Sequence, residues 1–169
     1  LIGEHVSALE RTLTAIIRAA RRPQREGRMP GCDATAVVGE RITFWSALTE
    51  DQNRVAAISL PNDPLPVRCS AEDLAAAVDA LLENVVAHTP EETAFSVRLE
   101  ATEAGARLIV SDEGPGLGPD AGERGRSDRG STGLGLSIAR QVAEASGGSM
   151  TIGSSPSGGA AITLDLNRS

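Results

Sequence analysis

The chain of 169 residues contains no lysine, and all 16 of its basic residues are arginines. This absence excludes several classes of enzyme. A phosphate-binding loop of the Walker type needs its lysine, a serine/threonine protein kinase needs a lysine on a strand, and a pyridoxal enzyme needs a lysine for its Schiff base.

Cysteine and histidine are also rare, with two of each. Cys32 and Cys69 lack CxxC spacing and follow no secretory leader, so we expect two reduced thiols in a cytosolic domain and no zinc site. No apolar run is long enough to span a membrane. Because the chain begins without an initiator Met, we expect it to be a piece of a longer protein.

The formal net charge is -7, and the arginines are scattered along the chain. Binding to a nucleic-acid backbone therefore has little electrostatic support, and we expect no nucleic-acid partner. A small anionic ligand is compatible with this composition, because a local arginine cluster can act within a net acidic chain. The length fits one domain with an appendage.

The first 22 residues carry apolar side chains spaced alternately by four and three positions. These side chains are Ile2, Val6, Leu9, Leu13, Ile16 and Ala20. The spacing is typical of a helix that packs on partner helices, so we expect residues 1–22 to form part of a dimerisation bundle; a helix lying on its own domain is the alternative. Residues 23–32 are rich in Pro and Gly and read as a linker, which leaves residues 33–169 as the globular domain.

Three helices are expected in this domain. Asp33 and Ser70 can each cap a helix, and these helices should end near Glu50 and at His88. A third should begin near Leu134 and end at the glycines of positions 147 and 148. The candidates for the buried sides of the first two helices are Val37, Ile42, Trp45 and Leu48, and then Leu74, Val78, Leu81 and Val85.

Strands are expected at 55–60, 67–69, 95–101, 107–111, 150–153 and 160–166, with a turn at 61–66. Helices alternate with strands, and several strand pairs are short hairpins. We therefore predict an α/β fold, a two-layer sandwich in which about three helices cover one mixed β-sheet.

Asn84 lies near the end of the second helix, and helical geometry places it on one flank with Ala80, Ala87 and His88. Its amide oxygen suits Mg²⁺, which prefers hard oxygen ligands and keeps several waters and substrate phosphates. An isolated Asn that satisfies a neighbouring backbone group is the alternative. The spacing lets Asn84 and His88 face the same cleft.

Asp112 ends an apolar strand and is followed by Gly114 and Gly116. A carboxylate there can accept a hydrogen bond from the exocyclic amine of adenine, while the glycines let the ring approach the backbone. This arrangement would select adenine over guanine. A simple turn residue before a Gly-Pro-Gly loop is the alternative.

A second glycine cluster precedes the third helix. Free N–H groups at a helix start attract phosphate oxygens, and hydroxyl groups can assist them. The residues concerned are Ser131, Thr132, Gly133, Leu134, Gly135 and Leu136. Residues 119–129 read as a flap whose Arg124 and Arg126 could clamp phosphates, or as a solvated loop with incidental charge. Neither glycine cluster fits the dinucleotide-binding template.

Three segments in this order resemble motifs of bacterial sensor histidine kinases. Residues 81–90 resemble the N box, 112–118 the first glycine box and 131–136 the second glycine box. The resemblance covers about residues 33–166. It implies the Bergerat ATP-binding fold, with ATP under a flexible lid and a helical dimerisation and phosphoacceptor domain beside it.

The resemblance also implies the cofactors, ATP and Mg²⁺, and the roles of single residues. Asn84 corresponds to the Mg²⁺ ligand, His88 to a position near the phosphates and Asp112 to the adenine-reading residue. Gly114 and Gly116 correspond to the adenine-side glycines, and residues 133–136 to the phosphate-side loop. Ala80, Ala87 and a lid without Phe depart from the pattern and leave fewer polar supports for the nucleotide.

The phosphoacceptor histidine is expected outside this chain. His5 is followed by Val6 rather than by an acid, and only one helix precedes the linker. The expected partners are an acceptor domain, in the same longer chain or in trans, and a response regulator downstream. The N-terminal helix could also form a homodimer. We expect a cytoplasmic location, either as a separate protein or as the cytoplasmic part of an inner-membrane sensor.

Three other readings stay open on the sequence alone. An ATPase of the gyrase and chaperone type would need an acid one turn before Asn84, where the chain has Ala80. An anti-sigma-factor serine kinase would share the fold, but the heptad helix and the adjoining linker favour a histidine kinase. A degenerate module would bind nucleotide or partners and transfer nothing.

Overall fold

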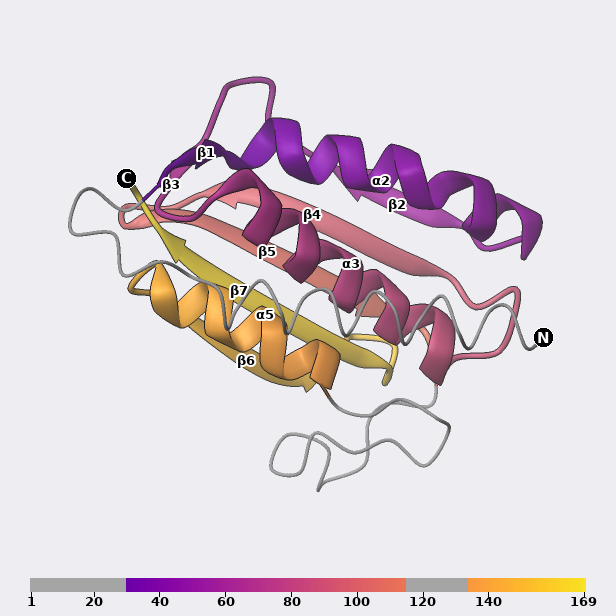
Figure 1. The fold of residues 1–169 in the computed structure, drawn as a ribbon. Helices are drawn as coiled ribbons and strands as arrows, with labels where there is room; N and C mark the ends of the chain where they lie inside the picture. The colour runs from indigo at the N-terminus through magenta and orange to yellow at the C-terminus, as the bar shows by residue number, and fades with distance from the viewer. Residues whose placement is uncertain (1–29, 115–133) are drawn as a thin grey trace.

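The computed structural model describes residues 30–114 and 134–169 (Figure 1). Within these residues the chain forms three helices and seven strands. In order they are β1 Cys32–Asp33, α2 Ala34–Asp51, β2 Ala56–Ser59, β3 Pro66–Val67, α3 Ala71–His88, β4 Phe95–Ala101, β5 Gly105–Asp112, α5 Leu134–Ala145, β6 Ser149–Ser154 and β7 Ala160–Asn167. The predicted bundle helix, residues 1–22, lies outside the described residues, as does the predicted linker as far as residue 29.

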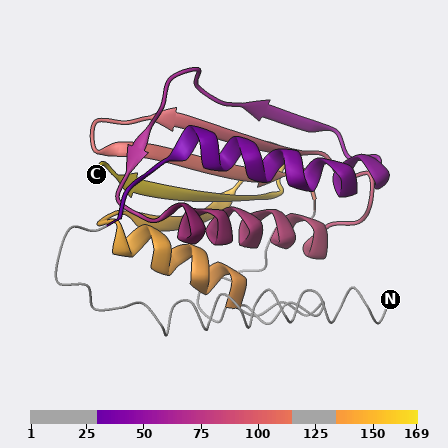
Figure 2. The same ribbon diagram turned by 45° about the horizontal axis from the view of Figure 1, so that its top comes forward.

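Five strands form one sheet in the order β2-β4-β5-β7-β6. β2 pairs with β4 in parallel, and the other neighbours are antiparallel. β1 and β3 form a separate antiparallel pair. All three helices cover the same face of the large sheet (Figures 1 and 2), so the predicted two-layer α/β sandwich with a mixed sheet is confirmed. Across the described ranges, no helix has both the length and the apolar character needed to cross a bilayer.

The core lies between the helices and the inner face of the sheet. Alternate residues of the central strands are buried, as period-two geometry requires. On α3 the predicted apolar positions Leu74, Val78, Leu81 and Val85 are all buried, which confirms the expected face of that helix. α3 packs against both α2 and α5 and is therefore the central helix of the layer.

The helix ends follow local chemistry. The carboxylate of Asp33 accepts a hydrogen bond from the backbone N–H of Thr35 at 3.0 Å, and the hydroxyl of Ser70 accepts one from that of Asp73 at 3.0 Å. α5 ends where Gly147 adopts a positive φ of 95°. Its C-terminal carbonyls accept hydrogen bonds from the two following glycines, a Schellman turn. All three helices thus lie where the sequence predicts them.

The buried side of α2 was predicted less well. Val37 and Trp45 are buried, but Leu48 is 38% exposed, so its assignment to the core is wrong, and Ile42 is only partly buried. The reason is the position of α2 beside the edge strand β2, all of whose residues are exposed. A helix at the border of a sheet has less surface to pack against than a central one.

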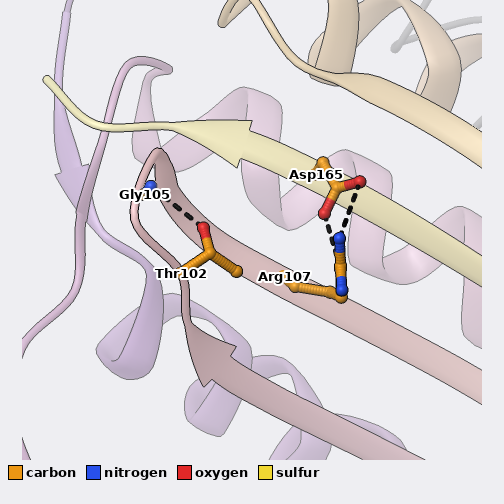
Figure 3. A network of polar contacts seen from close by, with 4 residues as sticks. All are labelled: Thr102, Gly105, Arg107 and Asp165. Carbon is orange, nitrogen blue, oxygen red and sulfur yellow. Dashed lines mark hydrogen bonds and ion pairs between the residues drawn. The ribbon is translucent and has the colours of Figure 1, made fainter.

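The predicted turn at 61–66 joins strands of two different sheets, because β2 belongs to the large sheet and β3 pairs with β1. β5 also begins at Gly105, earlier than expected, and its turn is closed by a hydrogen bond from the Gly105 N–H to Thr102 Oγ1 at 3.0 Å (Figure 3). On the outer face, Arg107 of β5 pairs with Asp165 of β7 at 2.7 Å. This is the face of the sheet that the helices do not cover.

Candidate functional site

Asn84 lies on α3 and is 6% exposed. One helical turn earlier, Ala80 borders the start of α5: a Cβ added to Gly135 would lie 3.6 Å from the Cβ of Ala80, an ordinary contact distance. His88, the last residue of α3, is partly buried, and Ala87 is exposed. The structure therefore brings the flank of α3 that carries Ala80 and Asn84 together with the beginning of α5.

Asp112 is the last residue of β5 and is 5% exposed. Its Oδ1 accepts hydrogen bonds from the backbone N–H groups of Gly114 at 2.9 Å and Ala160 at 3.3 Å. The backbone carbonyl of Asp112 accepts a hydrogen bond from Ser155 Oγ at 2.9 Å. Among residues 30–114 and 134–169, both hydrogen bonds to the carboxylate use Oδ1.

Two glycines allow this close packing around Asp112. A Cβ on Gly159 would lie 2.0 Å from the carbonyl oxygen of Asp112 and 2.7 Å from Oδ1. A Cβ on Gly114 would lie 2.5 Å from Cγ2 of Thr89. No side chain fits at either position without displacing its neighbour, so both glycines are required for the observed geometry.

Arg54 is buried beside the C-terminal end of α3, with 6% of its surface exposed. Its Nη1 donates to Thr89 Oγ1 at 2.7 Å and to the carbonyl of Thr93 at 3.2 Å, and its Nη2 donates to the carbonyl of Thr89 at 3.1 Å. Nε donates to Gln52 Oε1 at 2.7 Å. The guanidinium therefore joins the end of α2, the end of α3 and the loop before β4.

The electrostatic setting of Arg54 follows from its burial. Removal from water lowers the pKa of the Arg54 guanidinium from its ordinary value, because desolvation disfavours the charged form. The carboxylates of Glu91 and Asp112 act in the opposite direction and favour the charge. Arg54 thus adds positive potential near the carboxylate of Asp112.

Five residues around Asp112 were not predicted from the sequence as part of the site: Arg54, Thr89, Ser155, Gly159 and Ala160. Their roles depend on contacts between segments far apart in the chain, and no local pattern distinguishes an arginine before a strand as buried. The Gly-Gly pair at 158–159 was the available signal, because a glycine pair before a strand often marks a tight backbone approach.

Two further predicted site residues lie in α5. Leu134 is the first residue of α5, and Leu136 is a buried member of the core. The remaining predicted residues lie outside the described ranges: Gly116, Arg124, Arg126, Ser131, Thr132 and Gly133. Their roles stay predictions.

A concave region is lined by residues of α2, β2, α3 and β4. It is a groove of about 350 Å³ whose walls include Ile42, Trp45, Ile58 and Phe95 and, at one end, Arg54. This groove is mainly apolar. It was not predicted from the sequence, and it approaches Asp112 through Arg54 and through Phe95, which pairs with Asp112 across β4 and β5.

Comparison with known proteins agrees with the geometry. The profile of the family "Histidine kinase-, DNA gyrase B-, and HSP90-like ATPase" matches residues 69–169, more than half of the chain. The probable sensor histidine kinase TcrY of Mycobacterium tuberculosis is 37% identical over 112 residues, which cover 59% of this chain and 23% of that protein.

Solved structures are also similar. The mycobacterial sensor histidine kinase MprB is 26% identical with a TM-score of 0.66, over 83% of this chain and 98% of that one. The catalytic domain of histidine kinase ThkA gives a TM-score of 0.74 at 18% identity, over 84% and 97% of the two chains, and supports the fold alone. The chain spans between 9% and 23% of three curated relatives. The predicted family and fold are confirmed.

Proposed function

Because the chain belongs to the histidine kinase-, DNA gyrase B- and HSP90-like ATPase family, we propose that residues 33–169 bind Mg²⁺-ATP and donate its γ-phosphate to a histidine of a dimerisation and phosphoacceptor domain. The observation that carries this proposal is the anchoring of Asp112. Two backbone N–H groups hold its Oδ1. A buried carboxylate fixed in this way presents Oδ2 as a rigid acceptor for the exocyclic amine of adenine.

The side chains of the site fit a Mg²⁺ ion that is bound together with a nucleotide and not by protein ligands alone. In the part of the chain that the structure describes, no three His, Cys, Asp or Glu side chains are grouped so that they could hold a metal ion. Asn84 would contribute one neutral amide oxygen. Phosphate oxygens and water would supply the other ligands, which is how Mg²⁺ commonly binds in phosphoryl-transfer sites.

The phosphates would lie at the start of α5, which packs on α3 beside Ala80, one turn before Asn84. Free N–H groups at a helix start favour anions. The proposed contacts from the second glycine box are those of residues 131–136, and Arg124 and Arg126 would neutralise phosphate charge. His88 would lie near the phosphates.

Transfer itself requires little covalent chemistry from this domain. The bond between the γ-phosphorus and the β–γ bridging oxygen breaks, a bond to an imidazole nitrogen of the acceptor forms, and ADP leaves. Positioning and charge neutralisation supply most of the catalysis. The acceptor histidine, a response regulator downstream and a cytoplasmic location are part of the proposal, as in two-component signalling.

The ATPase alternative is disfavoured by Ala80. The position where an acid would activate water is filled by an alanine that lies against Gly135. The acid in the turn of α3 before Asn84 is Glu83, and as the adjacent residue it does not lie on the same helix face as Asn84.

Binding is tested by equilibrium titration with a non-hydrolysable ATP analogue, with and without Mg²⁺. We expect Asp112→Ala to weaken binding by at least about tenfold in both conditions, because a charge-assisted hydrogen bond is lost. Asn84→Ala should weaken it mainly when Mg²⁺ is present. Arg107→Ala, on the outer face, is the matched control. Unchanged affinity in both site variants would place the site elsewhere.

Transfer is tested by mixing the chain, labelled ATP and separately prepared acceptor domains of histidine kinases. We expect label on the acceptor and none on this polypeptide. Label retained at His5 would contradict the assignment of the acceptor to another segment or chain, and binding without any transfer would favour a nucleotide-binding module.

A further inference from the structure

Arg54 is a buried cation, and its hydrogen-bond partners among the described residues are all neutral. They are two backbone carbonyls, one hydroxyl and one amide. None of the ion pairs between residues of the described ranges includes Arg54. Burial of a charge without a directly paired carboxylate is costly, so its retention calls for a physical reason.

One reason is local. Thr89 is the C-cap of α3, and a cation at a helix C-terminus is stabilised by the helix dipole. This would make Arg54 a cap and nothing more. The contacts of Arg54 continue, however, beyond α3.

A short series of contacts joins Arg54 to Asp112. Arg54 holds both the hydroxyl and the carbonyl of Thr89. The methyl carbon of Thr89 lies so close to Gly114 that a Cβ on this glycine would be 2.5 Å from it. The N–H of Gly114 in turn donates to Asp112 Oδ1 at 2.9 Å. Only two residues therefore separate the guanidinium from the carboxylate.

A second path runs through the loop before β4. Arg54 donates to the carbonyl of Thr93, and the next residue, Ala94, accepts a hydrogen bond from the N–H of Glu113 at 2.9 Å. Thus two of the segments that contact residues 112–114, the end of α3 and the loop before β4, are attached to one guanidinium. Planar guanidinium geometry suits such multiple attachment, which a lysine ammonium would not reproduce.

We infer that Arg54 is a positioning residue for nucleotide selection: by holding Thr89 and Thr93 it fixes Gly114, and Gly114 fixes the carboxylate of Asp112 in the orientation that accepts from adenine. The inference rests on the proposed function. Arg54 makes no contact with the nucleotide itself; it acts through the backbone that carries Asp112.

The test compares the affinities of the whole chain for ATP and GTP analogues, both with Mg²⁺. Guanine presents a carbonyl where adenine presents an amine, so the ratio of the two affinities reports on the orientation of Asp112. We expect Arg54→Met to reduce this ratio by about tenfold, comparable with the weakening of one charge-assisted hydrogen bond. Arg54→Lys should restore the ratio only in part. If Arg54 is only a helix cap, both affinities fall in the same proportion and the ratio stays constant.

The decisive experiment measures the effect of Arg54→Met in a chain that also carries Asp112→Asn. If Arg54 acts through Asp112, Arg54→Met has no further effect on the ratio in the Asp112→Asn variant. An equal effect in both backgrounds would overturn the inference. A wild-type chain that binds neither analogue would instead refute the proposed function, so the two failures are distinguishable.

Thr89→Ser covers the case in which Arg54→Met does not fold. It keeps the hydroxyl and carbonyl that Arg54 holds but removes the methyl group that contacts Gly114. We expect a reduced ATP-to-GTP ratio and a thermal unfolding midpoint close to that of the wild type. An unchanged ratio in Thr89→Ser would contradict the proposed series of contacts.

Discussion

Helices α2 and α3 each have 18 residues and lie side by side on the same face of the sheet, yet they are buried to different degrees (Figure 1). α3 packs between α2 and α5, and its apolar face, including Leu74 and Leu81, is fully buried. On α2, Phe44 is 60% and Leu48 38% exposed. Equal length on the same sheet therefore does not give equal burial.

The strands beside these helices differ in the same way. Val55 and Ile58, in and next to β2, are 71% and 40% exposed, whereas the residues of β5 that face α3 are buried. Asn84 and Asp112 belong to the central region and Arg54 connects it to the edge. Polar groups are placed more precisely where neighbours constrain them from several sides, as they constrain the carboxylate of Asp112.

The largest expected effect is a difference in the free energy of unfolding between matched truncations on the two helices. Leu81→Ala removes a side chain with 0% exposure and should lower the free energy of unfolding by about 3 kcal/mol, because lost burial and a residual cavity add together. Leu48→Ala should lower it by less than about 1 kcal/mol. Urea unfolding of both variants measures the difference, and similar losses would show that the α2 edge is as well packed as the centre.

The next effect concerns the backbone around Asp112. Gly159→Ala places a Cβ 2.0 Å from a backbone oxygen, so the turn before β7 must move. We expect a loss of about 2 kcal/mol in the free energy of unfolding, a typical size for overpacking, together with weaker binding of the ATP analogue. Gly153→Ala on the edge strand β6 is the control, since a Cβ there meets nothing within 4 Å. Equal behaviour of the two variants would contradict the role of the close approach.

A smaller effect is expected at the contact between the two helices. Asp79 of α3 accepts hydrogen bonds from Arg41 Nε at 2.8 Å and from Trp45 Nε1 at 2.9 Å, both on α2. Asp79→Ala should lower the free energy of unfolding by about 1 kcal/mol, since the pair is partly exposed and the buried indole N–H loses its acceptor. Asp165→Ala, which removes the exposed outer-face pair, should change it less. The reverse order would indicate that α2 is held mainly by apolar contacts.

The central region was also the more predictable one. Ser70, the apolar positions of α3 and the end of β5 at Asp112 follow from local periodicity and capping, and the structure has them where the sequence predicts them. Leu48 was assigned wrongly because helix periodicity identifies an apolar face but not what lies opposite. Arg54 and Gly159 escaped prediction because their contacts join segments distant in the chain, which no local spacing encodes.

The smallest predicted effect concerns the two cysteines at the start of the domain. A hydrogen bond from the Cys69 side chain lowers the pKa of Cys32 and outweighs burial and the nearby acids Asp33 and Asp73, which raise it. A thiol with a lowered folded-state pKa stabilises the fold above its unfolded pKa and loses that contribution as the pH falls through its folded pKa. Stability relative to Cys32→Ala should therefore rise slightly as the pH enters the range in which thiols ionise.

The role of Cys69 is measured by alkylating Cys32 with iodoacetamide over a range of pH and following the reaction by mass spectrometry. The midpoint of the alkylation curve should lie at higher pH in Cys69→Ala than in the wild type, because the thiolate of Cys32 loses its hydrogen bond. An identical midpoint would mean that Cys69 does not stabilise the thiolate.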